Sequence, residues 1–395
     1  MKSPDQYIQE LAALLAPVGI EELVWQDCVG RILAQTITSE RDSPAADVSA
    51  MDGYAVRSND ISRANIPIFC TMAAGYPPSE FPPGNCARIF TGAVVPQQAD
   101  FVIRREDVIE EQNSISIPPE YSAQSGDNIR RRGENAARGS IILRSGITLN
   151  QANLSGVLSG GNRVVDVRRR VRVGIINTGD ELVDLHQPLE PWQIRDSNGP
   201  TLEFFCGQIP WVELLKRERV ADSREKILQQ LTMLLPNVDA IFLTGGVSMG
   251  DTDHVPHAIQ EAGAKIVFHR IPIRPGKPIL GAVTRDSKLI LGLPGNPVSV
   301  AVTALRFGLP LLRKIAGLEE LQFPTLPVHI RNCDTKTIPL TWYRLATLNM
   351  DGTVNLIDTH GSGDLISLAN SDGVVEISPG CHGPGPFPWY PWTQA

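Results

Sequence analysis

Three short apolar runs, each closed by a glycine-rich turn, constrain the fold of this chain more than any other feature. The runs lead into turns at residues 178–181, 244–251 and 293–297. Short apolar runs that end in glycine are typical of buried parallel strands, and each is followed by a segment with helical character. In an open α/β sheet the carboxyl ends of such strands meet at one edge, where ligands bind. We therefore predict a central, mostly parallel α/β sheet with a ligand site at that edge.

The chemistry of these turns favours a ligand that carries phosphate or another oxyanion. Glycine lets backbone amides approach an anion closely, and the N-terminus of a following helix adds partial positive charge. The turns also carry the carboxylates of Asp180, Glu181, Asp251 and Asp253. Carboxylates in this setting would suit a divalent cation, so we expect a metal ion to accompany the anion.

The loop 244–253 gives the stronger signal. It has three glycines where a structural turn needs one or two, and it adds the hydroxyls of Thr244 and Ser248. We interpret it as a phosphate- or pterin-binding loop, with Gly245 and Gly246 among its binding positions. It matches neither a Walker A motif nor Gly-x-Gly-x-x-Gly, so generic nucleotide hydrolysis is not supported.

Two further turns offer groups for an anion. Residues 273–278 read Ile-Arg-Pro-Gly-Lys-Pro, in which proline on both sides pre-orders Lys277. An ammonium fixed in this way is a good point-charge partner for an oxyanion. Residues 293–299 present the amides of Gly295 and Asn296 just before the start of a predicted helix.

Two shorter motifs leave their role open. Asp52 lies in Ser-Ala-Met-Asp-Gly-Tyr-Ala-Val (49–56), which is either an Asp-Gly turn between strands or a place where an exposed carboxylate contacts a ligand. The pair Thr91-Gly92 is either a β-turn or a hydroxyl-plus-amide donor pair.

Composition excludes several classes of protein. The 395 residues allow two to four domains, and the net charge of −7 argues against a broad nucleic-acid surface. No apolar stretch approaches the roughly 20 residues of a membrane span, and the N-terminus lacks a signal-peptide core, which predicts a cytoplasmic protein. The six cysteines are scattered without a Cys-x-x-Cys pair, so we read them as reduced structural thiols rather than zinc or iron–sulfur ligands.

The chain changes character along its length. Short β-type runs with Pro and Gly turns over about 24–121 predict a small β-rich domain. Strands alternate with helices after residue 170, whereas beyond 318 a hairpin with an Asp-Gly turn (341–357) predicts a small β-barrel or sandwich. The tail 383–392 holds so many prolines that we expect it to run extended, outside any central strand.

Helix ends can also be placed. Ser3-Pro-Asp-Gln6 resembles a capping box, Asp222-Ser223 caps a helix that Pro236 ends, and a further helix follows Pro297 over 298–307.

Taken together, these motifs resemble the molybdopterin molybdenumtransferase family, the MoeA type shared with the E domain of gephyrin. The motifs occur in the family's order along essentially the whole chain: 49–56, 91–93, 131–134, 178–182, 196–198, 245–253, 274–278 and 293–299. The resemblance implies a homodimer of elongated subunits with four domains. These are an elongated N-terminal domain (1–42 plus 131–167), a β-rich insert domain (43–130), an α/β molybdopterin-binding domain (168–317) and a C-terminal β-barrel domain (318–395).

The resemblance further implies an activity: transfer of molybdenum from molybdate to adenylylated molybdopterin with release of AMP, supported by Mg²⁺. The pocket would form between the α/β domain of one subunit and domains of the other. Molybdopterin adenylyltransferase and molybdoenzyme acceptors are the protein partners it implies. The carried-over catalytic residues are Asp52, Thr91, Glu181, Asp253 and Lys277. The substrate-binding residues that we expect are Gly245, Gly246, Ser248, Arg274, Pro294, Gly295, Asn296, Pro297, Arg344 and Ser362, of which Pro294, Pro297, Arg344 and Ser362 are carried over from the family. The metal ligands that we expect are Glu181, Asp196, Asp251 and Asp253.

The chain departs from the family pattern at Asn135, Ala221 and Gly363, where the family has Asp, Asp and His, and at Arg274, where it has Lys. Arg for Lys keeps the charge but changes the geometry. Two alternatives stay open beside the transferase. One is a molybdopterin adenylyltransferase, because that family shares the central α/β module, and the other, which the departures support, is a non-catalytic cofactor-binding or scaffold paralogue. A preference for tungstate is a further reading of the same departures.

Overall fold

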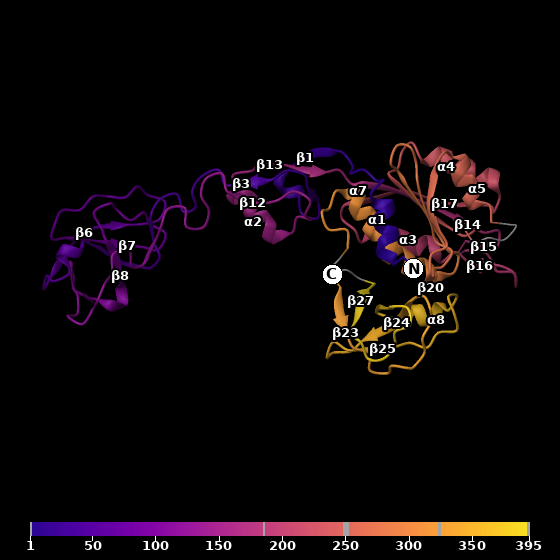
Figure 1. Cartoon of the computed structure of the whole chain (residues 1–395). Helices are drawn as coiled ribbons and strands as arrows, with labels where there is room; N and C mark the ends of the chain where they lie inside the picture. Colours follow the sequence, from indigo (N-terminus) through magenta and orange to yellow (C-terminus); the bar gives the residue numbers. More distant parts are fainter. Residues whose placement is uncertain (1, 185, 248–252, 323–324, 393–395) are drawn as a thin grey trace. The chain divides into compact units, whose positions relative to one another are not determined.

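The computed structural model describes residues 2–184, 186–247, 253–322 and 325–392 (Figure 1). The chain forms two compact units. The larger unit comprises the chain up to Gln35, residues Ser145–Asn150, and everything from Val164 onward. The smaller unit comprises Thr36–Arg144 and Gln151–Arg163. The fold is a mixture of α/β and β sheets in several domains, as the sequence pattern predicts.

The larger unit is built on a six-stranded sheet, in the order β17-β14-β18-β22-β21-β19. Its strands are β14 (Val171–Thr178), β17 (Val212–Val220), β18 (Ala240–Thr244), β19 (Lys265–His269), β21 (Leu280–Val283) and β22 (Leu289–Leu293). The pairs β14–β17, β14–β18 and β18–β22 are parallel, while β21 pairs antiparallel with both β22 and β19. The three predicted apolar runs are the neighbouring strands β14, β18 and β22, so their glycine-rich turns share one sheet edge.

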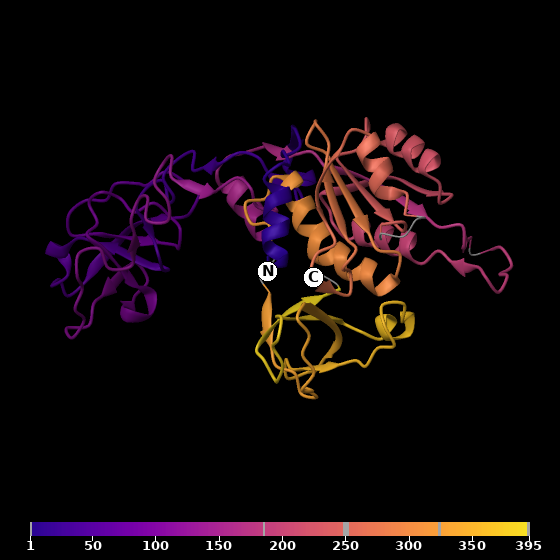
Figure 2. The same ribbon diagram turned by 45° about the vertical axis from the view of Figure 1, so that its right-hand side comes forward.

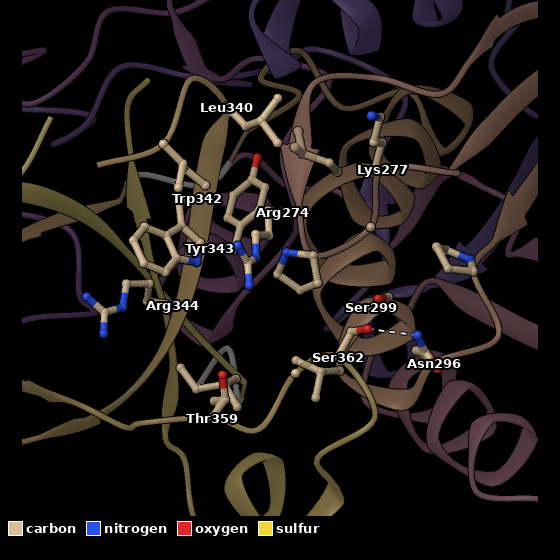
Figure 3. Close-up of a pocket in the computed structure, with 18 of the residues that line it drawn as sticks. Arg274, Lys277, Asn296, Ser299, Leu340, Trp342, Tyr343, Arg344, Thr359 and Ser362 are labelled. Atoms are coloured by element: carbon tan, nitrogen blue, oxygen red, sulfur yellow. Dashed lines mark hydrogen bonds between the residues drawn. The ribbon is translucent and has the colours of Figure 1, made fainter. Parts of the chain in front are cut away.

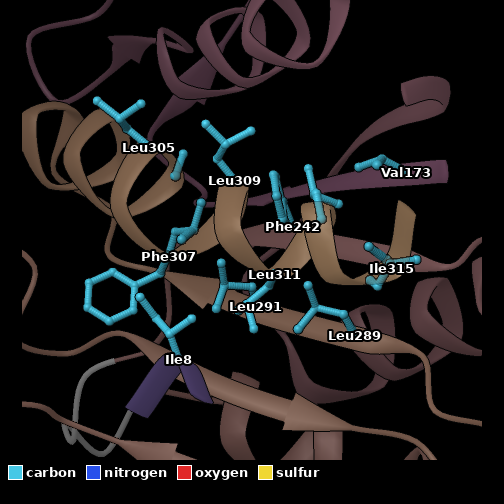
Figure 4. Packing of buried hydrophobic residues seen from close by; sticks show 14 of the residues in the cluster. Ile8, Val173, Phe242, Leu289, Leu291, Leu305, Phe307, Leu309, Leu311 and Ile315 are labelled. Carbon is cyan, nitrogen blue, oxygen red and sulfur yellow. The ribbon is translucent and has the colours of Figure 1, made fainter. Parts of the chain in front are cut away.

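Helices cover both faces of this sheet (Figure 2). One face packs against α1 (Pro4–Ala12), α3 (Asn198–Gly207), α6 (Pro297–Thr303) and α7 (Leu309–Ala316), and the other against α4 (Arg224–Leu234) and α5 (Val255–Glu261). The two-residue period of a strand explains this division. On β18, Phe242 belongs to the first face (Figure 4), whereas Ile241 and Leu243 belong to the second.

The predicted helix ends are confirmed in part. Ser3 and Gln6 form a capping box at the start of α1, and the Ser223 hydroxyl accepts from the Lys226 amide at the start of α4. The helix predicted over 298–307 runs further, because a π-helical segment, η4 (Ala304–Gly308), joins α6 to α7. Apolar periodicity does not reveal such an insertion, since it shifts the helix face without interrupting the helix.

The C-terminal part of the larger unit forms a second sheet, in the order β20-β24-β26-β27-β23. Its strands are β20 (Ile273–Arg274), β23 (Leu326–Val328), β24 (Thr341–Leu348), β26 (Gly373–Ile377) and β27 (Phe387–Pro391), with β25 (Val354–Leu356) also paired to β24. The antiparallel β24–β25 pair confirms the predicted hairpin. A short helix, α8 (Leu365–Ala369), follows β25.

The expectation for the proline-rich tail was wrong, because β27 lies inside this sheet between β26 and β23. Pro388 pairs only with β23, and Pro391 pairs only with β26. Each proline is therefore paired with a neighbouring strand on one side only. Its lack of an N–H donor is tolerated because no strand of the described chain is paired with it on the other side.

Two smaller sheets complete the larger unit. The strands β1 (Ile20–Val24), β13 (Val164–Arg168) and β2 (Ile32–Leu33) form an antiparallel three-stranded sheet. The short parallel pair β15 (Leu182–Val183) and β16 (Ile194–Arg195) follows the turn after β14. A 3₁₀ turn, η1 (Trp25–Asp27), follows β1.

The smaller unit is rich in β structure, as its short apolar runs predict. Its main sheet has the order β8-β5-β7-β6-β10-β9. The strands are β5 (Gly53–Val56), β6 (Ile66–Met72), β7 (Cys86–Ile89), β8 (Phe101–Arg104), β9 (Ile109–Glu110) and β10 (Ser114–Ser116). Two short pairs, β3 (Ile37–Thr38) with β12 (Ile141–Leu143) and β4 (Val48–Ser49) with β11 (Ile129–Arg130), accompany helix α2 (Gln151–Ser159) and the turns η2 (Ser58–Asp60) and η3 (Arg105–Asp107).

Candidate active site

A cavity of about 740 Å³ opens in the larger unit where the α/β sheet meets the C-terminal sheet (Figure 3). Its walls come from the turn after β20, the loop before α6, the strand β24 and the loop after β25. Six of the predicted site residues line it: Arg274, Lys277, Pro294, Asn296, Arg344 and Ser362. Segments far apart in the sequence thus converge on one space large enough for a small-molecule ligand.

Two cations of this cavity come from the turn at residues 274–278. The turn is held by its backbone, since the Ile271 amide donates to the Lys277 carbonyl at 3.0 Å and the Ile279 amide donates to the Gly276 carbonyl at 3.0 Å. The side chains of Arg274 and Lys277 are exposed. Across the described ranges of the chain, neither side chain forms an ion pair with a carboxylate, so their charges are available to a ligand.

Arg344 differs from these two cations because its charge is already balanced. Its side chain is only 8% exposed, its Nη1 donates to Asp334 Oδ2 at 2.7 Å, and Asp358 lies 3.9 Å away. Burial raises the pKa of Asp334, but the hydrogen bonds from Arg344 and the Lys336 amide outweigh burial and hold that pKa below its usual value. Arg344 therefore enters the cavity wall as part of a neutral ion pair.

Neutral donors occupy the opposite wall. Asn296 Nδ2 donates to Ser362 Oγ at 2.7 Å (dashed in Figure 3), and the Val298 amide donates to the Ser362 carbonyl at 3.1 Å. The Gly295 carbonyl accepts from Asn198 Nδ2 at 2.7 Å. These bonds fix the loop that contains Pro294 and Pro297, the latter being the first residue of α6.

The glycine-rich turns of the sheet edge pack closely on one another. Gly245 and Gly246 have φ angles of 88° and 57°, a region that favours glycine. A Cβ on Gly245 would lie 2.5 Å from the Thr178 carbonyl oxygen, and a Cβ on Gly295 would lie 3.7 Å from the Gly245 Cα. The three turns predicted to share one edge therefore lie side by side.

Acidic residues gather beside these turns. Asp222 is half-buried, and its amide donates to Asp180 Oδ1 at 3.1 Å. Its Oδ1 has no hydrogen-bond partner among the described residues. Burial, followed by the charges of Asp180, Glu181 and Asp253, raises the pKa of Asp222, although His254 opposes the shift. Asp222 therefore lies near three other carboxylates at this end of the sheet.

The predicted metal ligands are described only in part, because Asp251 lies outside the described residues. Within the described residues, no group of three or more His, Cys, Asp or Glu side chains is arranged to hold an ion. Asp196 accepts from the Gly199 amide at 2.9 Å and from Arg217 Nη1 at 3.2 Å. Two predicted residues, Asp251 and Ser248, lie outside the described residues.

Asp52 and Thr91 belong to the smaller unit. The Thr91 amide and hydroxyl both donate to Asp52 Oδ1, each at 2.8 Å. These two bonds, with smaller contributions from Arg105 and Arg88, hold the pKa of Asp52 below its usual value. The side chain of Asp52 is exposed beside a small cavity of about 20 Å³.

Several site residues had no signal in the sequence. Lys336, Trp342, Tyr343 and Thr359 also line the large cavity. Trp342 could have been found only from the pairing of β20 with β24. The two strands belong to different regions of the chain, since β20 lies in the α/β region and β24 in the C-terminal sheet. Lys336 comes from an irregular loop without a motif.

Comparison with known proteins places this geometry in a family. Two family models match the chain, one described as "MoeA N-terminal region (domain I and II)" at residues 2–161 and one as "Probable molybdopterin binding domain" at residues 174–314. The molybdopterin molybdenumtransferase of Synechococcus elongatus is 36% identical over 379 residues, 92% of this chain and 91% of the relative. The chain belongs to the molybdopterin molybdenumtransferase family.

Other relatives agree with this assignment. The molybdopterin molybdenumtransferase of a Nostoc species is 35% identical over 372 residues, which cover 88% of this chain and 82% of the relative. A crystal structure of the molybdopterin biosynthesis MoeA protein of Pyrococcus horikoshii has a TM-score of 0.81 and 26% identity, with all of both chains covered. The family resemblance drawn from the motifs is thereby confirmed. Among the described residues, no helix has the length and apolar character needed to cross a membrane.

Proposed function

We propose that this chain transfers molybdenum from molybdate to adenylylated molybdopterin and releases AMP. The observation that carries the proposal is the large cavity, which is lined by Arg274 and Lys277 and by the neutral donors Asn296 and Ser362. Among the residues that the structure describes, neither cation is paired with a carboxylate. A dianion needs positive charge that nearby carboxylates have not already neutralised. Molybdate is such a dianion, and the names of the relatives support it as the ligand of this cavity.

In this proposal the two cations hold molybdate by charge and hydrogen bonds. Lys277 acts as a point charge on an ordered turn, and Arg274 offers a planar fork of donors. Ser362 is positioned by Asn296 to add a neutral donor or acceptor. The glycine-rich turns at the sheet edge, with Gly245, Gly246 and Gly295, offer close backbone approach to the phosphate and pterin portions of the second substrate.

Magnesium belongs to the proposal through the acidic residues at the sheet edge. In the part of the chain that the structure describes, Asp222 Oδ1 has no hydrogen-bond partner, and the charges of neighbouring carboxylates raise the pKa of Asp222; both observations fit a place where a divalent cation would relieve repulsion. Glu181 and Asp253 would hold the ion. When bound, Mg²⁺ would offset the charge of the phosphate groups of adenylylated molybdopterin. Asp196, already paired with Arg217, would serve as a ligand only after that pair opens.

The remaining parts of the proposal rest on the family resemblance. They are catalytic roles for Asp52 and Thr91, closure of the C-terminal sheet as a barrel, the four-domain division, a homodimer, a cytoplasmic location, and exchange with molybdopterin adenylyltransferase and molybdoenzymes.

Nucleotide release tests the proposal directly. Purified protein is mixed with adenylylated molybdopterin and Mg²⁺, and AMP is measured with and without molybdate or tungstate. AMP release that depends on either oxyanion supports the transferase, and the two rates give the metal preference. ATP-dependent adenylylation of molybdopterin would instead indicate an adenylyltransferase. Binding of adenylylated molybdopterin without nucleotide chemistry in either assay would indicate a non-catalytic paralogue.

A further inference from the structure

The indole of Trp342 lies between two guanidinium groups on the wall of the large cavity (Figure 3). The Arg344 Cζ atom lies 4.5 Å from the centroid of the indole ring, and the Arg274 Cζ atom lies 5.8 Å from it. Both distances are within the range of about 6 Å over which an aromatic face attracts a cation.

The sheet itself imposes this arrangement. β20 and β24 are parallel, and their register pairs Arg274 directly with Trp342. Trp342 and Arg344 are two residues apart on β24, so they lie on the same face of the strand. The body of Trp342 packs against the buried cluster of the C-terminal sheet that includes Val375 and Trp389, which holds the ring in place.

The two arginines differ in what else holds them. Arg344 is nearly buried and is fixed by its hydrogen bond to Asp334, so it does not depend on the ring. For Arg274, the indole is the single charge-orienting contact found over the described stretches of the chain. A long exposed side chain otherwise keeps much of its rotamer freedom, and ordering it on binding costs affinity.

We propose that Trp342 is a positioning residue for Arg274. The indole face orders the Arg274 guanidinium toward the cavity, so that its N–H groups are arranged to bind a tetrahedral oxyanion before the anion arrives. A lysine at position 274 would present a point charge with no plane to stack. The inference rests on the proposed function for the identity of the anion as molybdate, while the positioning itself follows from the strand register and the ring distances.

A mutant cycle on molybdate binding tests the proposal. The variants are W342L, W342F, R274M and the double variant W342L/R274M, and calorimetry gives the molybdate Kd of each. W342L should weaken binding about 3- to 10-fold, the range expected from losing one cation–π contact. W342F, which keeps an aromatic face, should stay within about twofold of the wild type. In the R274M background, W342L should cause no further loss.

Two results would overturn the proposal. One is a W342L protein that binds molybdate as tightly as the wild type. The other is an equal loss from W342L with or without Arg274, because Trp342 would then act through something else. In steady state, W342L should raise the KM for molybdate and leave kcat at saturating molybdate unchanged, whereas damage to the fold would lower kcat as well.

Fluorescence keeps the test decisive if W342L folds poorly. The emission of Trp342 is the difference between the spectra of the wild type and W342F. This difference should change in R274M and on addition of molybdate to the otherwise native protein. A difference spectrum that responds to neither would contradict the proposal.

Failure of this inference can be told from failure of the proposed function. AMP release by the wild type, together with a silent W342L substitution, removes the positioning role alone. Absence of molybdate-dependent AMP release from the wild type removes the proposed function, while the cycle on the molybdate Kd still decides the role of Trp342.

Discussion

Replacing Lys277 by methionine tests the anion site at its simplest point. Lys277 lines the cavity, is exposed, and lies on a turn fixed by hydrogen bonds at the Gly276 and Lys277 carbonyls. Methionine keeps the length and the apolar stem but removes the charge. We therefore expect K277M to fold as the wild type and to bind molybdate more weakly.

The magnitude follows from the exposure of the ammonium. A hydrogen bond to a charged group contributes about 1.5–3 kcal/mol, and an exposed group belongs at the lower end because solvent and salt screen it. A loss of about 1.5 kcal/mol corresponds to roughly a tenfold rise in the molybdate Kd. The rise should shrink as ionic strength increases.

The assay is isothermal titration of molybdate into wild type, K277M, K277R and K226M. Lys226 is an exposed lysine on α4 that does not line the cavity, so K226M is a matched control for the loss of one positive charge. K277R should recover part of the affinity because it restores the charge with different geometry. An unchanged Kd in K277M, or an equal loss in K226M, would refute the argument that Lys277 contacts the anion.

Three further predictions concern stability. R306M should destabilise the larger unit by about 3–5 kcal/mol. Arg306 is 2% exposed and its Nε lies 2.8 Å from the half-buried Glu376, so the substitution leaves that carboxylate without its arginine partner. Thermal unfolding measures the loss, and the double variant R306M/E376Q should recover part of it. D364N should lower the unfolding temperature at neutral pH but not near pH 2. Hydrogen bonds from the His360 and Ser367 amides and from the Ser367 hydroxyl lower the pKa of Asp364 to about 2. The contribution of Asp364 to the free energy of unfolding is therefore present above its unfolded pKa of about 4 and is lost as pH falls through about 2. Equal unfolding temperatures of D364N and the wild type at neutral pH would contradict this. G53A should disrupt the smaller unit at a cost above about 4 kcal/mol, since a Cβ there would lie 1.9 Å from the Ile103 carbonyl oxygen; unchanged resistance to limited proteolysis would contradict it.

The sequence predicted those parts of the fold that are encoded locally. The runs ending at Thr178, Thr244 and Leu293 are neighbouring strands, because an apolar run of that length between turns has few other ways to bury both faces. Ser3 and Ser223 cap their helices, since capping depends on residues only three positions apart. The hairpin with its turn at Asp351-Gly352 is likewise determined by residues close together in the sequence.

Features that depend on long-range pairing could not be predicted. The strand at 387–391 can lie inside the sheet because β23 pairs with its first half and β26 pairs with its second half. The number of prolines in the segment does not reveal this pairing. Trp342 reaches the site because β24 pairs with β20 from another part of the chain. The ion pair between Arg344 and Asp334 likewise depends on the tertiary fold, so no sequence pattern indicates that the charge of Arg344 is balanced while that of Arg274 is not.

Electron density for a bound oxyanion would test the central claim most directly. Crystals of the wild-type protein soaked in tungstate, measured at a tungsten absorption edge, would locate the anion without ambiguity. We predict an anomalous peak in the large cavity, within hydrogen-bonding distance of Lys277 and Arg274 and beside Ser362. A peak found only elsewhere in the chain, or a cavity that stays empty at saturating tungstate, would contradict the account.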